Sequence, residues 1–155
     1  MIRTIGMAVL FFTGAYAGYW ASMNLRKRIK LTESLLSLVR YIENKIKYFN
    51  LPLPDIYRDY NDPCLQKSGF MTALSDGWES ALEQIDIDSG AKIILTEFAR
   101  HLGKSVGEEQ EGNCRLCAAA LEEHIRTLKE DFPSRRKVYC SLGVSAGMLA
   151  VILLM

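Results

Sequence analysis

Two long segments without a charged side chain frame this sequence and limit what it can fold into. Among its 18 acidic and 19 basic residues, only Arg3 lies outside 26–137, so 4–25 and 138–155 are uncharged. As helices these segments are roughly 33 Å and 27 Å long, against a hydrocarbon core of about 30 Å. The pattern predicts transmembrane helices at 4–25 and 138–155 around a charged domain at 26–137, rather than a soluble globular monomer.

Basic residues stand at both ends of the charged domain, next to the predicted spans. Positive charge beside a span is typical of its cytoplasmic side, so we expect a cytoplasmic central domain with both termini across the membrane. We interpret this set as membrane-anchoring rather than as a nucleic-acid patch, because it lies beside the two predicted spans and the domain as a whole is charge-balanced. Its members are Arg26, Lys27, Arg28, Lys30, Arg135, Arg136 and Lys137.

The N-terminal segment also has the outline of a cleaved secretory signal. Ala15-Tyr16-Ala17 fits a small-residue cleavage site after an apolar stretch. Against this alternative, the uncharged run continues through Tyr19 and Trp20, and the basic cluster that follows resists translocation. We therefore favour a retained span.

Each predicted span contains a pair of glycines four residues apart, Gly14 with Gly18 and Gly143 with Gly147. This spacing leaves one helix face without side chains, so that another helix can approach closely inside the bilayer. We expect helix packing through these glycines. It can occur within one chain or between chains, which leaves a homo-oligomer open.

The central domain shows helical periodicity, and no stretch alternates long enough to predict a strand. We expect an all-α bundle with short helices at 53–60, 65–74 and 78–85. A further helix is expected to be capped by Ser89 and ended by Gly103. A long helix is expected to begin at a capping box at Ser105 and to be kinked or ended by Pro133. Trp78 is assigned to the core. One apolar stripe comprises Leu31, Leu35, Leu38, Ile42, Ile46 and Phe49, and another comprises Cys114, Cys117, Leu121, Ile125, Leu128 and Phe132.

Residues that would carry chemistry are few. Gly103-Lys104-Ser105 copies the end of a phosphate-binding loop but lacks the earlier glycine, because Phe98 stands there. Cys114 and Cys117, with His124, have the outline of a zinc site without a complete ligand set. We expect no catalytic residues, no cofactor and no metal. The alternative hypothesis is a membrane-anchored adaptor or sensor that binds a metal or ligand through Cys114, Cys117 and His124.

A family resemblance extends over the whole chain. It rests on a series of short motifs in order: Leu38-x3-Ile42-x3-Ile46-x-Tyr48, Pro52-Leu53, Trp78-Glu79-Ser80-Ala81-Leu82, Phe98-x3-Leu102-Gly103 with Gln110, Ser141-Leu142-Gly143-x3-Gly147, and the ending Leu153-Leu154-Met155. With these motifs the chain resembles the stage III sporulation protein AB family. It departs from the family pattern at Ala99 and Val106, where glycine and aspartate are usual.

The resemblance implies a mother-cell membrane protein in the complex that links mother cell and forespore. The family's cytoplasmic domain is similar to platform domains of secretion and pilus machines, which couple a cytoplasmic ATPase to a membrane assembly. The expected function is therefore a non-enzymatic scaffold or platform. Its expected partners are other stage III subunits and a cytoplasmic secretion-type ATPase, and its expected location is the mother-cell membrane facing the forespore.

Overall fold

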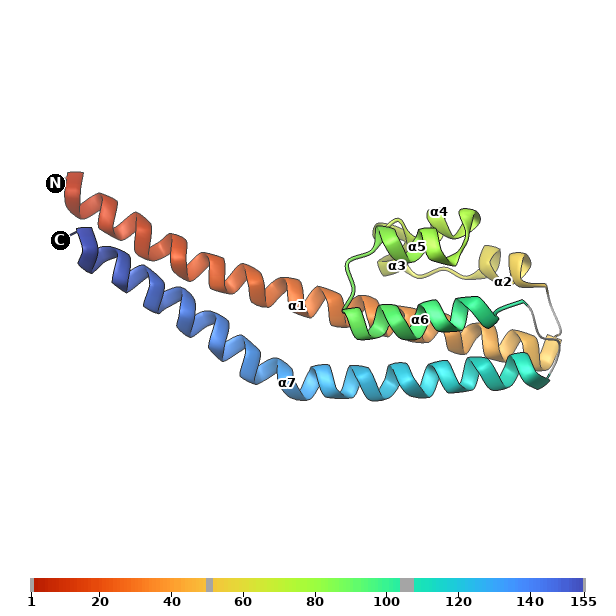
Figure 1. Cartoon of the computed structure of the whole chain (residues 1–155). Helices are drawn as coiled ribbons and strands as arrows, with labels where there is room; N and C mark the ends of the chain where they lie inside the picture. Colours follow the sequence, from red (N-terminus) through yellow and green to blue (C-terminus); the bar gives the residue numbers. More distant parts are fainter. Residues whose placement is uncertain (1, 50–51, 104–107, 155) are drawn as a thin grey trace. The chain divides into compact units, whose positions relative to one another are not determined.

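The secondary structure of the described residues is entirely helical. The computed structural model describes residues 2–49, 52–103 and 108–154, and it describes side-chain packing for 22–49, 52–103, 108–134 and scattered positions nearer the ends. These residues contain no strand, which confirms the all-α prediction. The elements are α1 (Ile2–Phe49), α2 (Leu53–Asp59), α3 (Pro63–Lys67), α4 (Phe70–Ala73), the 3-10 turn η1 (Leu74–Asp76), α5 (Trp78–Gln84), α6 (Ser89–His101) and α7 (Glu108–Leu154) (Figure 1).

The chain divides into two compact units. One comprises 1–27 with 128–155, and the other comprises 28–127. In the first unit the Arg26 guanidinium lies 5.9 Å from the centre of the Phe132 ring, a cation–π contact between α1 and α7. Across the described residues, no helix combines the length and apolar character that crossing a membrane requires. The four glycines of the predicted packing faces lie outside the residues whose packing is described.

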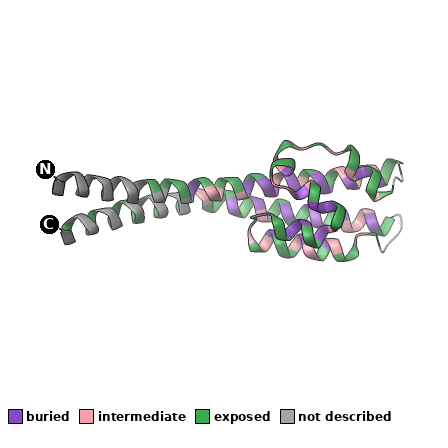
Figure 2. Ribbon diagram, turned by 90° about the horizontal axis from the view of Figure 1, so that it is seen from above, coloured by how far each residue is buried: buried purple, intermediate pink, exposed green. Residues whose placement is uncertain are grey.

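The core of the 28–127 unit is built on the two predicted apolar stripes (Figure 2). Leu35, Leu38 and Ile42 on α1 are fully buried, as are Cys114 and Leu121 on α7, and the two stripes meet in one cluster with the shorter helices. The core assignment of both stripes is confirmed at these positions.

The first predicted apolar stripe is wrong at its last residue, Phe49. It was predicted to be core, yet it is 64% exposed. Phe49 is the last residue of α1, one turn beyond the last buried position, Ile46. Its ring is covered by the Lys45 ammonium at 4.9 Å instead of by core side chains. Phe132, at the far end of the second stripe, is only half-buried.

Ion pairs show the relative direction of α1 and α7 in this unit. Arg40 pairs with Glu122 at 2.7 Å, and Lys47 pairs with Glu111 at 3.4 Å. Residue numbers rise on α1 as they fall on α7, so the two helices are antiparallel here. Three of these four side chains are exposed, Glu111 being the exception, and ion pairs at a protein surface contribute about 0–1 kcal/mol each. They therefore set register more than stability.

The predicted helix at 65–74 is wrong as a single element. Gly69 adopts φ +80, a left-handed conformation that ends α3 before α4 starts. Asp62 caps α3, since its carboxylate accepts hydrogen bonds from the backbone N–H groups of Cys64 and Leu65. The two short helices can thus turn toward the core separately.

One predicted helix cap is wrong, and one of the two alternatives predicted for Pro133, that it ends the long helix, is wrong as well. Asp88, not Ser89, caps α6, because its side chain accepts a hydrogen bond from the Gly90 N–H at 3.0 Å. Pro133 does not end the long helix, which continues to Leu154. A proline inside a helix removes one backbone N–H donor, and α7 continues past this position all the same. The capping box at Ser105 and the loop that begins at Lys104 lie outside the described residues.

Candidate interaction surface

The two cysteines of the C-x-x-C motif are buried in the helical core. Burial raises the pKa of the Cys114 thiol to about 12, with Glu43 nearby adding to the effect, and burial raises the pKa of Cys117 to about 12 as well. Metals bind the thiolate, so this environment opposes metal binding. In the part of the chain that the structure describes, no three His, Cys, Asp or Glu side chains are grouped to hold a metal ion. The structure thus does not bring Cys114, Cys117 and His124 together as one ligand set, because His124 pairs with Asp88.

His124 has a different partner, at the start of α6. Its Nε2 lies 2.9 Å from Asp88 Oδ2, and the same oxygen accepts the Gly90 N–H. The pair joins the cap of α6 to α7. Gly90 leaves room for it, since a Cβ atom at this position would lie 2.4 Å from His124 Cε1. The histidine therefore helps to hold two helices together.

Replacing Gly90 by alanine is expected to destabilise the chain by about 1–3 kcal/mol, because the new methyl group must displace the His124 ring from Asp88. Gly112→Ala is the matched control: Gly112 is also helical, but nothing lies within 4 Å of its Cβ position. That change should be neutral or stabilise by up to about 1 kcal/mol. Chemical unfolding followed by circular dichroism measures both. When His124 is already alanine, Gly90→Ala should cause almost no further loss in the free energy of unfolding. A loss that persists without the His124 ring contradicts the steric cause.

The predicted membrane-anchoring residues do not all have free charges. Arg28 forms a forked ion pair with Asp86, at 3.0 Å from Nε and 2.7 Å from Nη2, and this pair ties the segment before α6 to α1. Lys27, Lys30 and Lys137 are exposed. The side chains of Arg135 and Arg136 are not among those described.

The surface of the 28–127 unit has an apolar groove between α6 and α7, with a volume of about 370 Å³. Two large aliphatic side chains stand exposed beside it, Ile93 at 71% and Leu116 at 72%. We refer to this feature as the α6–α7 groove. Its lining residues are Ile93, Ile94, Glu97, Phe98, His101, Asn113, Leu116, Cys117 and Ala120.

Helix geometry explains why these two side chains remain exposed. On α6 the buried positions are Ala91, Leu95 and Phe98, and Ile93 lies about 200° around the helix from Ala91 at 100° per residue. On α7, Leu116 lies beside the buried stripe rather than on it. Sequence reasoning counted only apolar residues on the stripes and missed both positions. The sequence signal for an exposed apolar surface was an aliphatic residue, on each helix, that falls outside the regular apolar stripe.

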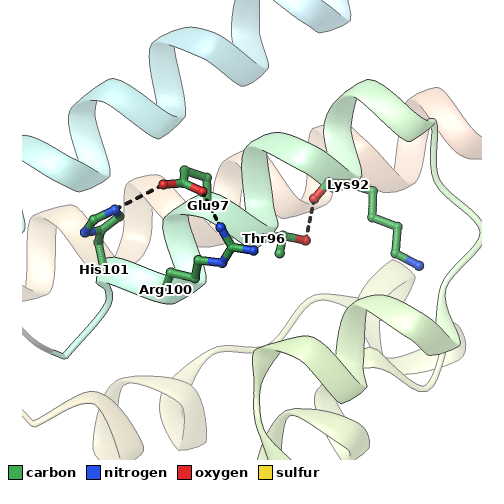
Figure 3. A network of polar contacts seen from close by, with 5 residues as sticks. All are labelled: Lys92, Thr96, Glu97, Arg100 and His101. Carbon is green, nitrogen blue, oxygen red and sulfur yellow. Dashed lines mark hydrogen bonds and ion pairs between the residues drawn. The ribbon is translucent and has the colours of Figure 1, made fainter.

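Polar side chains follow α6 beside the groove (Figure 3). The Glu97 carboxylate accepts a hydrogen bond from Arg100 Nη1 at 3.1 Å and lies 3.2 Å from His101 Nε2. Thr96 Oγ1 donates to the Lys92 carbonyl oxygen at 2.8 Å. Among the described residues, the Lys92 ammonium has no ion-pair partner. Lys92, Glu97 and Arg100 line a neighbouring hollow on α6, and together they carry a net charge of +1 beside the groove.

The described residues thus form an all-helical protein whose surface carries an apolar groove. A profile of the stage III sporulation protein AB family matches residues 3–155, which is nearly the full chain. The chain therefore belongs to the stage III sporulation protein AB family, and the resemblance found in the sequence is confirmed. This is not a known enzyme family. Searches of curated proteins and of solved structures find no match to the chain.

Proposed function

We propose that this stage III sporulation protein is a non-enzymatic platform subunit in the mother-cell membrane that faces the forespore. In this role it holds a cytoplasmic secretion-type ATPase in register with the other subunits of the membrane complex. The observation that carries the proposal is the α6–α7 groove, which lies on a well-packed helical unit. Ion pairs such as Arg40 with Glu122 and Lys47 with Glu111 lie on its surface. Such a surface suits binding to other proteins.

The membrane location is supported by the sequence. The uncharged segments 4–25 and 138–155 begin or end at basic clusters, and the positive charge lies on the side of the central domain. We propose that both segments span the membrane and that the domain between them, 26–137, is cytoplasmic.

Reporter fusions test this topology. A reporter after Met155 is expected outside the mother-cell cytoplasm, and one inserted beside the exposed Asn61 is expected inside it, because basic clusters resist translocation. Reporter activity and protease access in intact cells measure the two positions. A fusion after Arg3 is the control, since it should match the C-terminal fusion. A cytoplasmic reporter after Met155 would contradict the two-span topology.

The glycine pairs are proposed to hold the spans in the assembly. Gly143→Ile combined with Gly147→Ile is expected to reduce spore counts at least about tenfold and to reduce recovery of the complex, because β-branched side chains keep helices apart where backbones should meet. Spore counts and a membrane pull-down, compared at equal protein level, measure the effect.

The matched control is Val144→Ile with Met148→Ile, which has the same spacing on another face of α7. Both of these side chains are exposed in the structure. Normal sporulation of the abundant glycine variant would show that the glycine face has no partner. Equal sporulation defects in both variants would instead indicate that larger side chains anywhere on this part of α7 disturb the protein.

A further inference from the structure

We propose that the α6–α7 groove binds an amphipathic helix of another protein, one that carries carboxylates beside its apolar stripe. The proposal rests on the platform function and names the chemical class of its partner.

The first argument is the apolar surface of the groove. Ile93 and Leu116 are each more than two-thirds exposed, on neighbouring helices of a unit whose other large aliphatic side chains are mostly buried. The α7 side adds Cys117 and Ala120, which carry no charge, and Ala120 lies one helical turn from Leu116. A groove between two helices, with apolar side chains along it, is suited to the apolar face of a third helix.

The second argument is charge complementarity. Glu97 is the one acidic residue lining the groove in the described part of the chain, and its carboxylate is already engaged by Arg100 and His101. Lys92 lies on the same helix without an ion-pair partner among the described residues. An incoming carboxylate therefore meets the Lys92 ammonium at one end and, about two turns further along α6, the Arg100 guanidinium that Glu97 already shares.

The spacing of these cations limits the form of the partner. Lys92 and Arg100 are eight residues apart on α6, or about 12 Å along the helix axis. A helix lying along α6 matches both when its own acidic residues are about two turns apart. A neighbouring hollow on α6, lined by Lys92, Ile93 and Arg100 among others, continues the surface past Ile93. The complementary partner is therefore an acidic helix.

Peptide binding to the full chain in detergent micelles tests the proposal. The probe is a fluorescent helix-forming peptide with leucines at i, i+3 and i+7 and glutamates on both flanks, and a second peptide carries lysines in place of the glutamates. The glutamate peptide is expected to bind at least about tenfold more tightly. Lys92→Glu with Arg100→Glu should abolish or reverse that preference, because it inverts the charge of the groove edge.

Two further variants separate the groove from the rest of the surface. Leu116→Asp should weaken binding of the glutamate peptide at least about tenfold, with an unchanged circular dichroism spectrum because Leu116 is exposed. Arg58→Glu with Lys67→Glu, an equal charge change at exposed positions outside the groove, should leave binding unchanged. Equal affinity for the two peptides, or no loss in the Leu116 variant, would overturn the proposal.

Photocrosslinking from position 116 in sporulating cells identifies the natural occupant. The expected product joins this position to a helical segment of another protein, with acidic residues about two turns apart. Crosslinks to a second copy of this chain or to lipid would overturn the assignment. So would a crosslink yield no higher than that of a control probe at Thr72. These outcomes are independent of reporter topology and of the glycine variants, so a failure here is distinguishable from a failure of the platform function.

Discussion

Replacing Trp78 by alanine is expected to reduce the free energy of unfolding by about 3–5 kcal/mol, the largest effect of any single change considered. The indole is 8% exposed and packs edge-on against Phe70 and Phe98, with ring centres 5.5 Å apart in both cases. Its Nε1 donates a hydrogen bond to Tyr57 Oη at 3.0 Å. One side chain thus joins α2, α4 and α6 to α5.

Trp78→Phe is the matched control for this prediction. It keeps an aromatic ring among the same neighbours but removes the N–H donor to Tyr57, so a smaller loss of roughly 1–2 kcal/mol is expected. Chemical unfolding of the full chain in micelles, followed by circular dichroism, measures both variants. A loss below about 1 kcal/mol for Trp78→Ala would show that the aromatic cluster is not part of the cooperative core.

Leu38→Ala is expected to cost about 2–5 kcal/mol, because it opens a cavity in the fully buried stripe of α1. Ile93→Ala removes a similar number of carbon atoms from a side chain that is 71% exposed, and should cost less than about 1 kcal/mol. The same unfolding experiment compares them. Similar losses at the two positions would show that Ile93 is covered in the folded protein, which would remove it from the α6–α7 groove.

Periodicity made the helical class and most of the core predictable. Leu35, Leu38 and Ile42 recur at steps of three and four, and each is buried, because that spacing places them on one face of any α-helix. Trp78 was assigned to the core on the same ground. Phe49 followed the same spacing but is exposed, because a stripe says which face is apolar and does not say where the opposing surface stops.

The ends and breaks of individual helices were less predictable than the all-helical fold class. Asp88 and Ser89 are both good capping residues, and only the backbone path decides which side chain reaches a free N–H group. The division of 65–74 depends in the same way on Gly69, whose left-handed conformation is permitted by the residue type and imposed by the packing of the short helices.

The sequence by itself determined the helical class, the partition of charge between 26–137 and the uncharged ends, and the family, since these depend on residue types and their order. Only the tertiary structure decided which side chains meet. It placed His124 on Asp88 rather than beside the cysteines, engaged Arg28 with Asp86, and left Ile93 and Leu116 exposed on either side of a groove. Each of these outcomes depends on how one helix is rotated and placed against another, which the periodicity of a single helix does not contain.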